Sequence, residues 1–328
     1  MPDRPIPRRV AVTGADGFVG RRLLPRLRDA GYAVRGVVRS PRQADLLQRA
    51  GYEAALADVR DPDALRGAFA GAHAVVHLVA ILRERSGQTF AAVNRDGAAQ
   101  AASAARAADV ERFVHLSALG ASPDASRYLR SKWAGEEAVR SSGVRWVIFR
   151  PSIFLAPGGG AAAQFADVVR FGPWYPFVLT VGGRALFLRL ASLTPVVPVL
   201  GSGRYRSMPV ALDDVLPAVV AAIDRPAVVG RVFEIGGPEV VTYNDIVDTT
   251  ARVLRVRRRR VHLPPALSRA VVRAFALLPD PPITGDEAQA LFEENLCDNT
   301  AAVATFGLRL RPFDAAMREA LEAPQAKE

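Results

Sequence analysis

The sequence predicts an α/β protein with a doubly wound parallel sheet and a smaller, discontinuous C-terminal lobe. Three observations predict this fold class. Short apolar runs typical of buried strands recur through the first 150 residues, and helical segments separate them. The regularity fades after RPSIFLAPGGG at 150–160 and returns with a strand-like run, RVFEIGG, at 231–237. Because 50% of the 328 residues are hydrophobic, the chain can bury a substantial core.

The apolar runs and the segments between them predict the following strands and helices along the chain. A strand at 8–14 leads into a helix at 17–31, in which Gly31 is the expected C-terminal stop and Pro25 should bend the helix or cost one hydrogen bond. A later helix begins with Asp61 as its N-cap and Pro62 at its first position. Strands alternating with helices predict a parallel sheet. The other expected strands are a third strand ending before Asp58 and the runs at 33–39, 74–80, 112–118 and 145–151.

Three glycines lie at the junction between the first strand and the first helix, with the spacing G-x-x-G-x-x-G. Glycine at this turn lets the backbone approach a pyrophosphate, whose charge then lies at the helix N-terminus. We therefore expect a dinucleotide-binding loop here. The alternative is a tight turn that needs glycine only for packing. The residues of the loop are Gly14, Asp16, Gly17, Phe18, Val19 and Gly20.

The end of the second strand bears on the choice of cofactor. An acidic residue there would bind the ribose 2′-hydroxyl of NAD, but this chain has Arg39. A planar guanidinium suits the 2′-phosphate, so we expect NADP(H) to be preferred over NAD(H). The alternative is that Arg39 only continues the chain's general use of arginine. Asp58 and Val59 are expected at the adenine edge, and later strand ends complete the expected cofactor contacts with Val79, Ala80 and Pro151.

A lysine at position 132 is unusual in this chain, which has 43 Lys+Arg but only two lysines, Lys132 and Lys327. Lys132 follows Tyr128 by four residues in YLRSKWAGEE, so the two share one helix face. A nearby cation favours phenolate and lowers the pKa of a tyrosine from its usual value of about 10. We expect this pair to move a proton at the site. The alternative is that the lysine falls on a helix surface by chance.

Several motifs together resemble one superfamily: TGADGFVG, ADVRDPDAL, HLSA and YLRSK, with GRVFEIGGPEVVTYNDIV further on. They resemble the short-chain dehydrogenase/reductase superfamily, and most closely its atypical, extended, epimerase-like branch. That branch includes the accessory subunit nine of the complex I alpha subcomplex. The resemblance implies that Tyr128 donates or accepts the proton, that Lys132 assists it, and that Ser117 orients a substrate carbonyl. It also implies a role for Asn94, at a position often occupied by asparagine, and cofactor binding by the glycine loop.

We expect residues 1–156 to form an NAD(P)-binding Rossmann-type domain, its sheet completed by about 206–237. Residues 157–205 and 238–328 would form a substrate or partner lobe. Within this lobe, the segment 165–189 is rich in aromatic side chains flanked by arginines. It is expected to be the core of the lobe, a lid over an apolar substrate, or a contact with a membrane surface. Its aromatic residues are Phe165, Phe171, Trp174, Tyr175, Phe177 and Phe187.

Composition narrows the class of protein. The single cysteine, Cys297, excludes an intramolecular disulfide framework, and the N-terminus lacks the apolar region of a secretory signal, so a cytoplasmic location is expected, with peripheral membrane contact as an option. The net charge of +10 favours anionic ligands.

The basic segment RVRRRR at 255–260 lacks interleaved aromatics, so we expect it to form a solvated face or strand edge and to bind no nucleic acid. The four histidines lack metal-ligand spacing and are expected to be satisfied core or surface residues, with no metal site.

The leading hypothesis is an NAD(P)-dependent oxidoreductase that transfers hydride between NADP(H) and a small or apolar carbonyl or alcohol, with Tyr128 as acid/base. A second hypothesis is a non-catalytic nucleotide-binding subunit of a membrane or respiratory complex. A third is a binding protein that senses NADP(H). The sequence does not decide among them, because substrate specificity would depend on the second lobe, where the resemblance is weakest.

Overall fold

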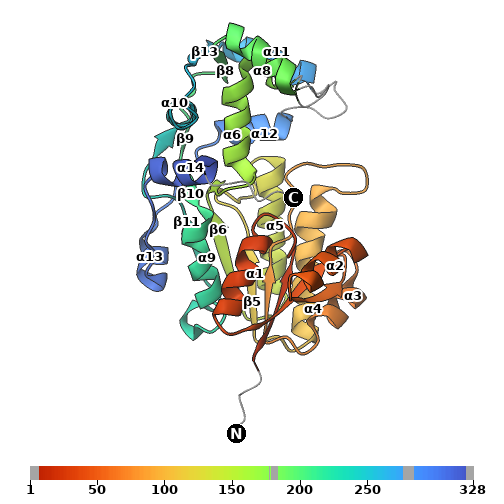
Figure 1. Cartoon of the computed structure of the whole chain (residues 1–328). Helices are drawn as coiled ribbons and strands as arrows, with labels where there is room; N and C mark the ends of the chain where they lie inside the picture. The colour runs from red at the N-terminus through yellow and green to blue at the C-terminus, as the bar shows by residue number, and fades with distance from the viewer. Residues whose placement is uncertain (1–6, 177, 179–183, 276–283, 323–328) are drawn as a thin grey trace. The chain divides into compact units, whose positions relative to one another are not determined.

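The computed structural model describes residues 7–176, 178, 184–275 and 284–322, and it shows two compact units (Figure 1). The first unit comprises Met1–Pro151, Asp213–Ile235 and Asn299–Arg309. The second unit comprises Ser152–Leu212, Gly236–Asp298 and Leu310–Glu328. The chain therefore leaves and re-enters each unit more than once.

The first unit is built on a seven-stranded parallel sheet with the order β11-β6-β5-β4-β1-β2-β3, which confirms the predicted doubly wound α/β fold. The strand order reverses between β1 and β4, so their carboxyl ends meet at the position where such folds bind ligands. Most strand side chains are buried, as expected for a parallel sheet covered on both faces. The strands are β1 (Arg9–Thr13), β2 (Ala33–Val38), β3 (Glu53–Leu56), β4 (Ala74–His77), β5 (Arg112–Leu116), β6 (Trp146–Pro151) and β11 (Val232–Ile235).

One face of this sheet packs against α3 (Pro62–Phe69), α4 (Asp96–Ala107) and α5 (Arg127–Ser141). The π-helix η1 (Ala91–Arg95) runs directly into α4. Alternate strand residues point into this layer, because successive side chains of a strand face opposite sides. Small side chains on α4 let the neighbouring helices approach closely, and the four fully buried ones are Ala98, Ala101, Ala102 and Ala105.

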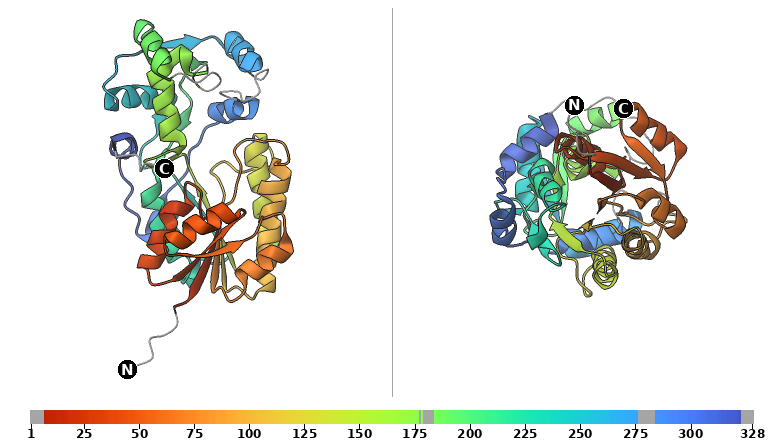
Figure 2. Two further views of the ribbon diagram at one scale, coloured as in Figure 1. Left: turned by 45° about the vertical axis from the view of Figure 1, so that its right-hand side comes forward. Right: turned by 90° about the horizontal axis from the view of Figure 1, so that it is seen from below.

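The opposite side carries α1 (Gly20–Asp29) and α9 (Leu212–Ala221), which an ion pair between Arg26 and Asp213 joins at 2.9 Å. Pro25 lies inside α1 as expected. Figure 2, left, shows the strands between the red N-terminal helices on one side and the orange and yellow helices on the other. The remaining helices of the unit are α2 (Pro41–Arg49), η3 (Pro226–Val228) and α13 (Thr300–Phe306).

The division of the chain differs from the expected bounds of 1–156 and 206–237 for the sheet-containing domain. Residues 206–211 lie in the second unit, and only β11 completes the sheet. Residues 299–309, expected in the second lobe, belong to the first unit. The physical reason is aromatic packing. The ring of Phe306 lies 5.5 Å from that of Phe149 on β6 and 4.9 Å from that of Phe233 on β11.

The described residues of the second unit form helices and three small two-stranded sheets. Its largest pairing is parallel, between β8 (Val196–Leu200) and β13 (Arg259–Leu263). The segment 255–260 was expected to be a solvated face or strand edge, and most of it is. Arg258 is the exception, because it donates to the backbone carbonyls of Val169, Arg170 and Ala191. The other elements are β7 (Phe154–Leu155), α6 (Gly160–Phe171), η2 (Gly172–Trp174), α8 (Arg184–Leu193), β9 (Arg206–Ser207), β10 (Val210–Ala211), β12 (Val241–Thr242), α10 (Tyr243–Val253), α11 (Pro265–Phe275), α12 (Gly285–Phe292) and α14 (Phe313–Glu322).

The aromatic segment 165–189 contributes to the core of the second unit. Phe171, Val178 and Phe187 form a buried cluster, with Trp174 and Tyr175 packed against it. The indole Nε1 of Trp174 donates to Thr194 Oγ1 at 2.8 Å. Phe177 lies outside the described residues. The described aromatic side chains of this segment therefore pack inward in large part, which supports the lobe-core interpretation.

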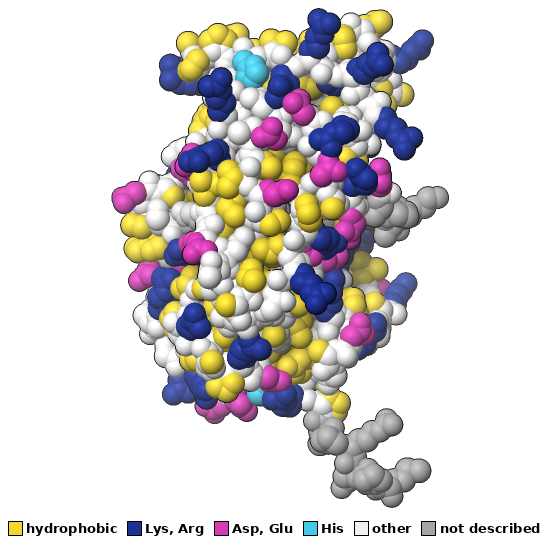
Figure 3. All heavy atoms as spheres, turned by 90° about the vertical axis from the view of Figure 1, so that its left-hand side faces the viewer, with side chains coloured by type: hydrophobic (Ala, Val, Ile, Leu, Met, Phe, Trp, Pro, Cys, Tyr) yellow, Lys and Arg dark blue, Asp and Glu magenta, His cyan; other side chains and the backbone are white. Residues whose placement is uncertain are grey.

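Two features of the surface bear on partners. On the face shown in Figure 3, dark blue basic side chains are mixed with magenta carboxylates and yellow side chains, so the described residues of this face form no continuous basic stripe. Within the described ranges, no helix is long and apolar enough to cross a bilayer.

Candidate dinucleotide and carbonyl site

The glycine loop between β1 and α1 has a backbone that only glycine allows at two positions. Gly14 has φ +70, in the left-handed region. A Cβ at Gly20 would lie 2.3 Å from the carbonyl oxygen of Gly14 and 2.5 Å from that of Ala15. Gly17 closes the turn by donating its N–H to Gly14 O at 3.0 Å, and it is exposed. The loop thus presents bare backbone at the carboxyl end of β1.

The first turn of α1 favours an anion. No side chain caps this helix N-terminus, and the first turn holds no acidic residue. It holds Arg21 and Arg22 instead, although cations near a helix N-terminus are unfavourable by about 0.3–1 kcal/mol each unless an anion is present. Arg22 lies over the ring of Phe18 at 4.9 Å, and Arg21 Nε donates to Asp16 O at 2.7 Å. These contacts hold both arginines beside the loop.

A side-chain contact ties the glycine loop to the turn after β2. Ser40 and Gln43 form a capping box at the start of α2, and the Gln43 amide also donates to the Asp16 carboxylate. Asp16 is thereby fixed against this turn, and Arg39 directly precedes the capping box. Arg39 is exposed and forms no hydrogen bond or ion pair within the described part of the chain. Its guanidinium is available to a ligand phosphate.

The other expected cofactor contacts lie at strand ends of the same sheet. Asp58 follows β3, and its carboxylate is held by Arg60, with Nε and Nη2 both at 2.8 Å. These hydrogen bonds, with smaller help from the charge of Arg39, lower the pKa of Asp58. Val59 is buried against Gly97. After β4, Val79 packs on Gly14, and Ala80 is exposed. At the end of β6, Pro151 is buried, and its carbonyl accepts a hydrogen bond from Leu119 N at 2.9 Å.

Lys132 lies on α5 with only 1% of its surface exposed. Its Nζ donates to the backbone carbonyl of Leu116, the last residue of β5, at 2.8 Å. Burial lowers the pKa of Lys132 to about 8, although the charge of Glu136 raises it. The lysine is therefore a buried group that exchanges its proton near neutral pH, and it does not lie on the helix surface.

Tyr128 begins the same helix, one turn before Lys132. Its ring is half-buried and lies 6.0 Å from that of Phe90. We expected Lys132 to lower the pKa of this tyrosine, and that expectation is wrong for this structure. Burial raises the pKa of Tyr128 to about 12, because desolvation disfavours the charged phenolate. At neutral pH Tyr128 is therefore a neutral phenol.

Asn94 is bonded to this helix directly, and Ser117 follows a residue that is bonded to it. Ser117 directly follows β5, and its buried Oγ has no hydrogen-bond partner among the described residues. Asn94 lies in η1, where its Nδ2 donates to Ser131 Oγ at 3.0 Å and to Ile81 O at 3.1 Å. Ser131 directly precedes Lys132, and Leu116 directly precedes Ser117. Two hydrogen bonds, from Lys132 to Leu116 and from Asn94 to Ser131, thus link β5, η1 and α5.

Two buried histidines beside Lys132 were not expected to belong to this region. His77 on β4 and His115 on β5 are register partners, with ring centroids 5.4 Å apart. Burial, followed by the charge of Lys132, lowers the pKa of His77 to about 3 and that of His115 well below its usual value. His77 Nδ1 pairs with Thr13 Oγ1 at 2.9 Å, but neither ring nitrogen of His115 has a partner in the described chain. The expectation that all four histidines are satisfied is therefore wrong for His115, and for His77 it holds at Nδ1 but not at Nε2, which has no partner among the described residues.

A second missed feature is the carboxylate of Glu136, one turn after Lys132. It is fully buried and accepts from Arg150 on β6 through both oxygens, each at 2.8 Å, and from Arg140 at 2.7 Å. Arg150 also reaches Glu234 on β11 at 3.3 Å. The i,i+4 spacing of Lys132 and Glu136 was a sequence signal that could have identified the carboxylate. Its partners on β6 and β11 could not be read from local sequence.

These residues fit a dinucleotide. The loop backbone leaves no room for a Cβ at Gly20, the helix N-terminus lacks a cap, and Arg39 is unpaired within the described ranges. The donors are those that bind phosphate: backbone N–H groups and guanidinium. Beyond them, the unpartnered Ser117 hydroxyl and the Tyr128 phenol supply hydrogen-bond donors. No group of three or more His, Cys, Asp or Glu side chains suited to a metal occurs in the described residues.

Comparison with known proteins agrees with this geometry. A family model described as NAD(P)H-binding matches residues 14–167. The chain is 30% identical over 307 residues to the mitochondrial NADH dehydrogenase (ubiquinone) 1 alpha subcomplex subunit 9 of Arabidopsis thaliana, covering 88% of this chain and 71% of that protein. It is 32% identical over 258 residues to the ceramide reductase of Caulobacter vibrioides, covering 78% of this chain and 73% of that protein.

A solved structure shares the fold. It is an NADPH-dependent quinone oxidoreductase from Escherichia coli complexed with NADPH, with a TM-score of 0.69 and 17% identity, covering 94% of this chain and 98% of that one. Together, the glycine loop, the family model and the two relatives identify the family. The chain belongs to the short-chain dehydrogenase/reductase superfamily, in the extended, atypical branch of NAD(P)-binding proteins related to complex I alpha subcomplex subunit 9.

Proposed function

We propose that this protein is a reductase that uses NADP(H) to reduce a small or apolar carbonyl compound, with Tyr128 as the proton donor. The observation that carries the proposal is the hydrogen bond from the buried Lys132 Nζ to the carbonyl of Leu116, the residue before Ser117. Ser117 has a buried hydroxyl without a partner among the described residues, and Tyr128 lies on the same helix as Lys132, one turn earlier. The relation to a ceramide reductase supports a carbonyl substrate with apolar parts.

The chemistry divides between cofactor and protein. The nicotinamide would supply hydride to the carbonyl carbon. Ser117 would donate a hydrogen bond to the carbonyl oxygen as negative charge develops there. Tyr128 would give that oxygen its proton, which a phenol with a pKa of about 12 holds firmly at neutral pH. Lys132 would stabilise the phenolate left behind, and Asn94 would hold α5 in place through Ser131.

The protonation state of Tyr128 suits the reductive step. A tyrosine with a pKa of about 12 carries its proton at neutral pH, which is the form needed to protonate a developing alkoxide. NADPH is the reduced cofactor that Arg39 suits best, because its exposed guanidinium has no competing partner in the described chain.

The test is the Tyr128→Phe variant. We expect its NADPH dissociation constant to stay within about twofold of the wild type, because the hydroxyl is not needed to hold the nucleotide. We expect single-turnover NADPH oxidation, measured against a panel of long-chain aldehydes and ketones, to fall by about 10²–10⁴-fold, the usual loss when a general acid is removed. Tyr52→Phe, also in the first unit but outside the site, is the matched control. Unchanged turnover in Tyr128→Phe would refute the role of the phenol.

A second candidate is a nucleotide-binding subunit without turnover, which would join a membrane or respiratory complex. The relation to complex I alpha subcomplex subunit 9 favours it. In that case bound NADPH stabilises the fold by mass action and is not consumed. Tight NADPH binding by the wild type, no oxidation with any carbonyl of the panel, and recovery of the protein in a large membrane complex would together favour this function over the reductase.

A further inference from the structure

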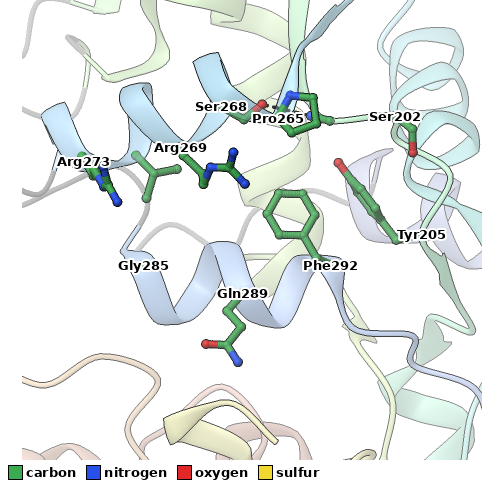
Figure 4. A pocket seen from close by; sticks show the side chains of 11 residues that line it. Ser202, Tyr205, Pro265, Ser268, Arg269, Arg273, Gly285, Gln289 and Phe292 are labelled. Atoms are coloured by element: carbon green, nitrogen blue, oxygen red, sulfur yellow. Dashed lines mark hydrogen bonds between the residues drawn. The ribbon is translucent and has the colours of Figure 1, made fainter.

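A cavity in the second unit lies between two helices and the turn after β8 (Figure 4). Its volume is about 650 Å³, within the ~300–1,000 Å³ of small-molecule sites. α11 forms one wall and α12 the other, and the ring of Phe292 stands between Arg269 and Tyr205. None of its lining residues is among those assigned above to the dinucleotide or the proton, all of which belong to the first unit.

One face of α11 lines the cavity. Pro265, Ser268, Arg269, Val272 and Arg273 follow the i, i+3, i+4, i+7, i+8 spacing of a single helix face. Such a stripe on an ordinary helix is covered by protein. Here no described residue covers it, and Phe292 on the facing helix keeps 44% of its surface exposed. Pro265, Val272 and Phe292 therefore offer apolar surface to a ligand.

Most polar groups of the lining already have partners. The Tyr205 hydroxyl donates to Leu200 O, and Ser268 Oγ donates to Leu263 O at 3.0 Å while accepting from Gly201 N at 3.1 Å. Gln289 donates to Glu293, and in Figure 4 its side chain points away from α11. An apolar ligand body would therefore leave few of these groups without a hydrogen bond.

Arg269 and Arg273 are the exception. Neither forms a hydrogen bond or ion pair with any residue that the structure describes. They lie four residues apart on one helix face, where like charges repel, and no carboxylate is among the lining residues. An anion placed between them would remove this repulsion and would accept charge-assisted hydrogen bonds from both guanidiniums.

We propose that this cavity binds an amphiphile with an anionic head, the head held by Arg269 and Arg273 and the apolar chain lying along Val272 and Phe292. The shared chemistry is an alkyl chain ending in a carboxylate or phosphate. Two sources carry it: a free fatty acid or alkyl phosphate, and an anionic lipid of a bilayer. The site does not depend on turnover at Tyr128.

Calorimetry on the full chain tests the proposal, with dodecyl phosphate as the probe below its micelle concentration. One molecule is expected to bind per chain, and dodecyltrimethylammonium, of the same chain length but opposite charge, is expected not to bind. Arg269→Gln/Arg273→Gln should weaken binding at least tenfold, and Arg269→Lys/Arg273→Lys should restore part of it. Arg189→Gln, an exposed arginine of the same unit outside the cavity, should change nothing.

The apolar wall has its own pair of variants. Val272→Trp fills the cavity and should abolish binding, whereas Ala270→Trp, on the same helix but outside the lining, should not. The melting temperature of each variant without ligand shows that it is folded. The proposal would be overturned if dodecyl phosphate fails to bind or if the cationic analogue binds equally well. It would also be overturned if neither Arg269→Gln/Arg273→Gln nor Val272→Trp weakens the binding of dodecyl phosphate.

Vesicles distinguish the two sources. Competition of dodecyl phosphate by phosphatidylglycerol vesicles, and none by phosphatidylcholine vesicles, supports the site and identifies a bilayer lipid as its ligand. Binding of dodecyl phosphate without competition from either vesicle supports the site and identifies a free amphiphile. Neither result depends on NADPH oxidation, so this proposal and the proposed reductase function fail separately.

Discussion

At the scale of single residues, the structure explains why a chain rich in arginine has a lysine at position 132. The side chain is 1% exposed, and its ammonium reaches one backbone carbonyl, that of Leu116. A guanidinium is planar, carries five donors and stays charged, so burial at this place would leave several donors without partners. An ammonium is compact and can release its proton when desolvated. The sequence singled out this residue by its rarity, but its burial and its contact with Leu116 depend on the packing of α5 against β5.

The lowered pKa of Lys132 predicts a pH-dependent stability. The folded pKa is about 8 and the usual value is 10.5, so between these values the unfolded chain binds a proton that the folded chain does not. Stability from this group therefore rises with pH across that window, and the cost of the buried charge is present in full below pH 8. In Lys132→Met this cost is gone at every pH.

We therefore expect the free energy of unfolding of Lys132→Met, relative to the wild type, to fall between about pH 7 and pH 10.5. The fall should be on the order of 3 kcal/mol, since each pKa unit corresponds to about 1.4 kcal/mol. Urea unfolding at several pH values measures it. Arg130→Met, an exposed cation on the same helix, is the control and should show a constant difference. A pH-independent difference for Lys132→Met would show that the lysine is not desolvated.

At the scale of elements, the sequence predicted the strands and the turn whose formation depends on neighbouring residues. The strands β1, β2, β5, β6 and β11 lie within the expected runs, and the glycine loop follows β1, because a buried parallel strand and a tight turn leave contiguous signatures. β4 is shorter than expected and ends at His77, and the expected run to residue 80 is irregular beyond it. The residues that follow are needed as a loop beside Gly14.

What local sequence could not predict depends on register and on distant segments. His77 and His115 meet because β4 and β5 pair at those residues, and no pattern within either strand specifies this pairing. Glu136 finds Arg150 across a helix–strand contact, and Phe306 joins the first unit from far along the chain. In the glycine loop, by contrast, all the residues that shape the site are neighbours in sequence.

His115 on β5 predicts that the stability of the protein falls at acidic pH. Its folded pKa is well below the usual 6.5, so as pH falls below that value the unfolded chain gains a proton that the folded chain does not, and stability is lost. His115→Phe removes this loss and also removes ring nitrogens that lack partners in the described chain.

We expect His115→Phe to unfold at a lower pH than the wild type in an acid titration followed by circular dichroism. At pH 7 the variant should gain about 1 kcal/mol, as expected when a buried polar group without a partner is removed. His262→Phe is the control, because His262 is exposed and pairs with Asn244. An unchanged midpoint for His115→Phe would mean that the ring is protonated or solvated in the folded state.

At the scale of the whole molecule, nucleotide binding should stabilise the protein by mass action, because the cofactor binds the folded chain alone. The melting temperature is therefore a measure of cofactor choice that needs no substrate. We expect NADPH to raise it more than NADH does at equal concentration. Arg39→Gln should weaken NADPH binding about tenfold, equivalent to about 1.4 kcal/mol, and leave NADH binding unchanged.

Arg49→Gln provides the matched control for this measurement, since Arg49 is an exposed arginine of the same unit that already pairs with Asp45. Its response to both nucleotides should equal that of the wild type. If NADH and NADPH raise the melting temperature of the wild type equally, the protein does not prefer NADP(H), and Arg39 is an ordinary surface arginine.

The interleaving of the two units has a consequence for synthesis on the ribosome. β6 ends at Pro151 and its neighbour β11 begins at Val232. The ribosome must therefore add about 80 residues before the edge of β6 can pair, which takes roughly 4–16 s at ~5–20 residues per second. An unpaired strand edge invites pairing with another nascent chain. Arg150 lies on this edge, and its bond to Glu136 needs only residues already made. We infer that this charged pair protects the unfinished sheet until β11 arrives with Glu234 as the second partner of Arg150.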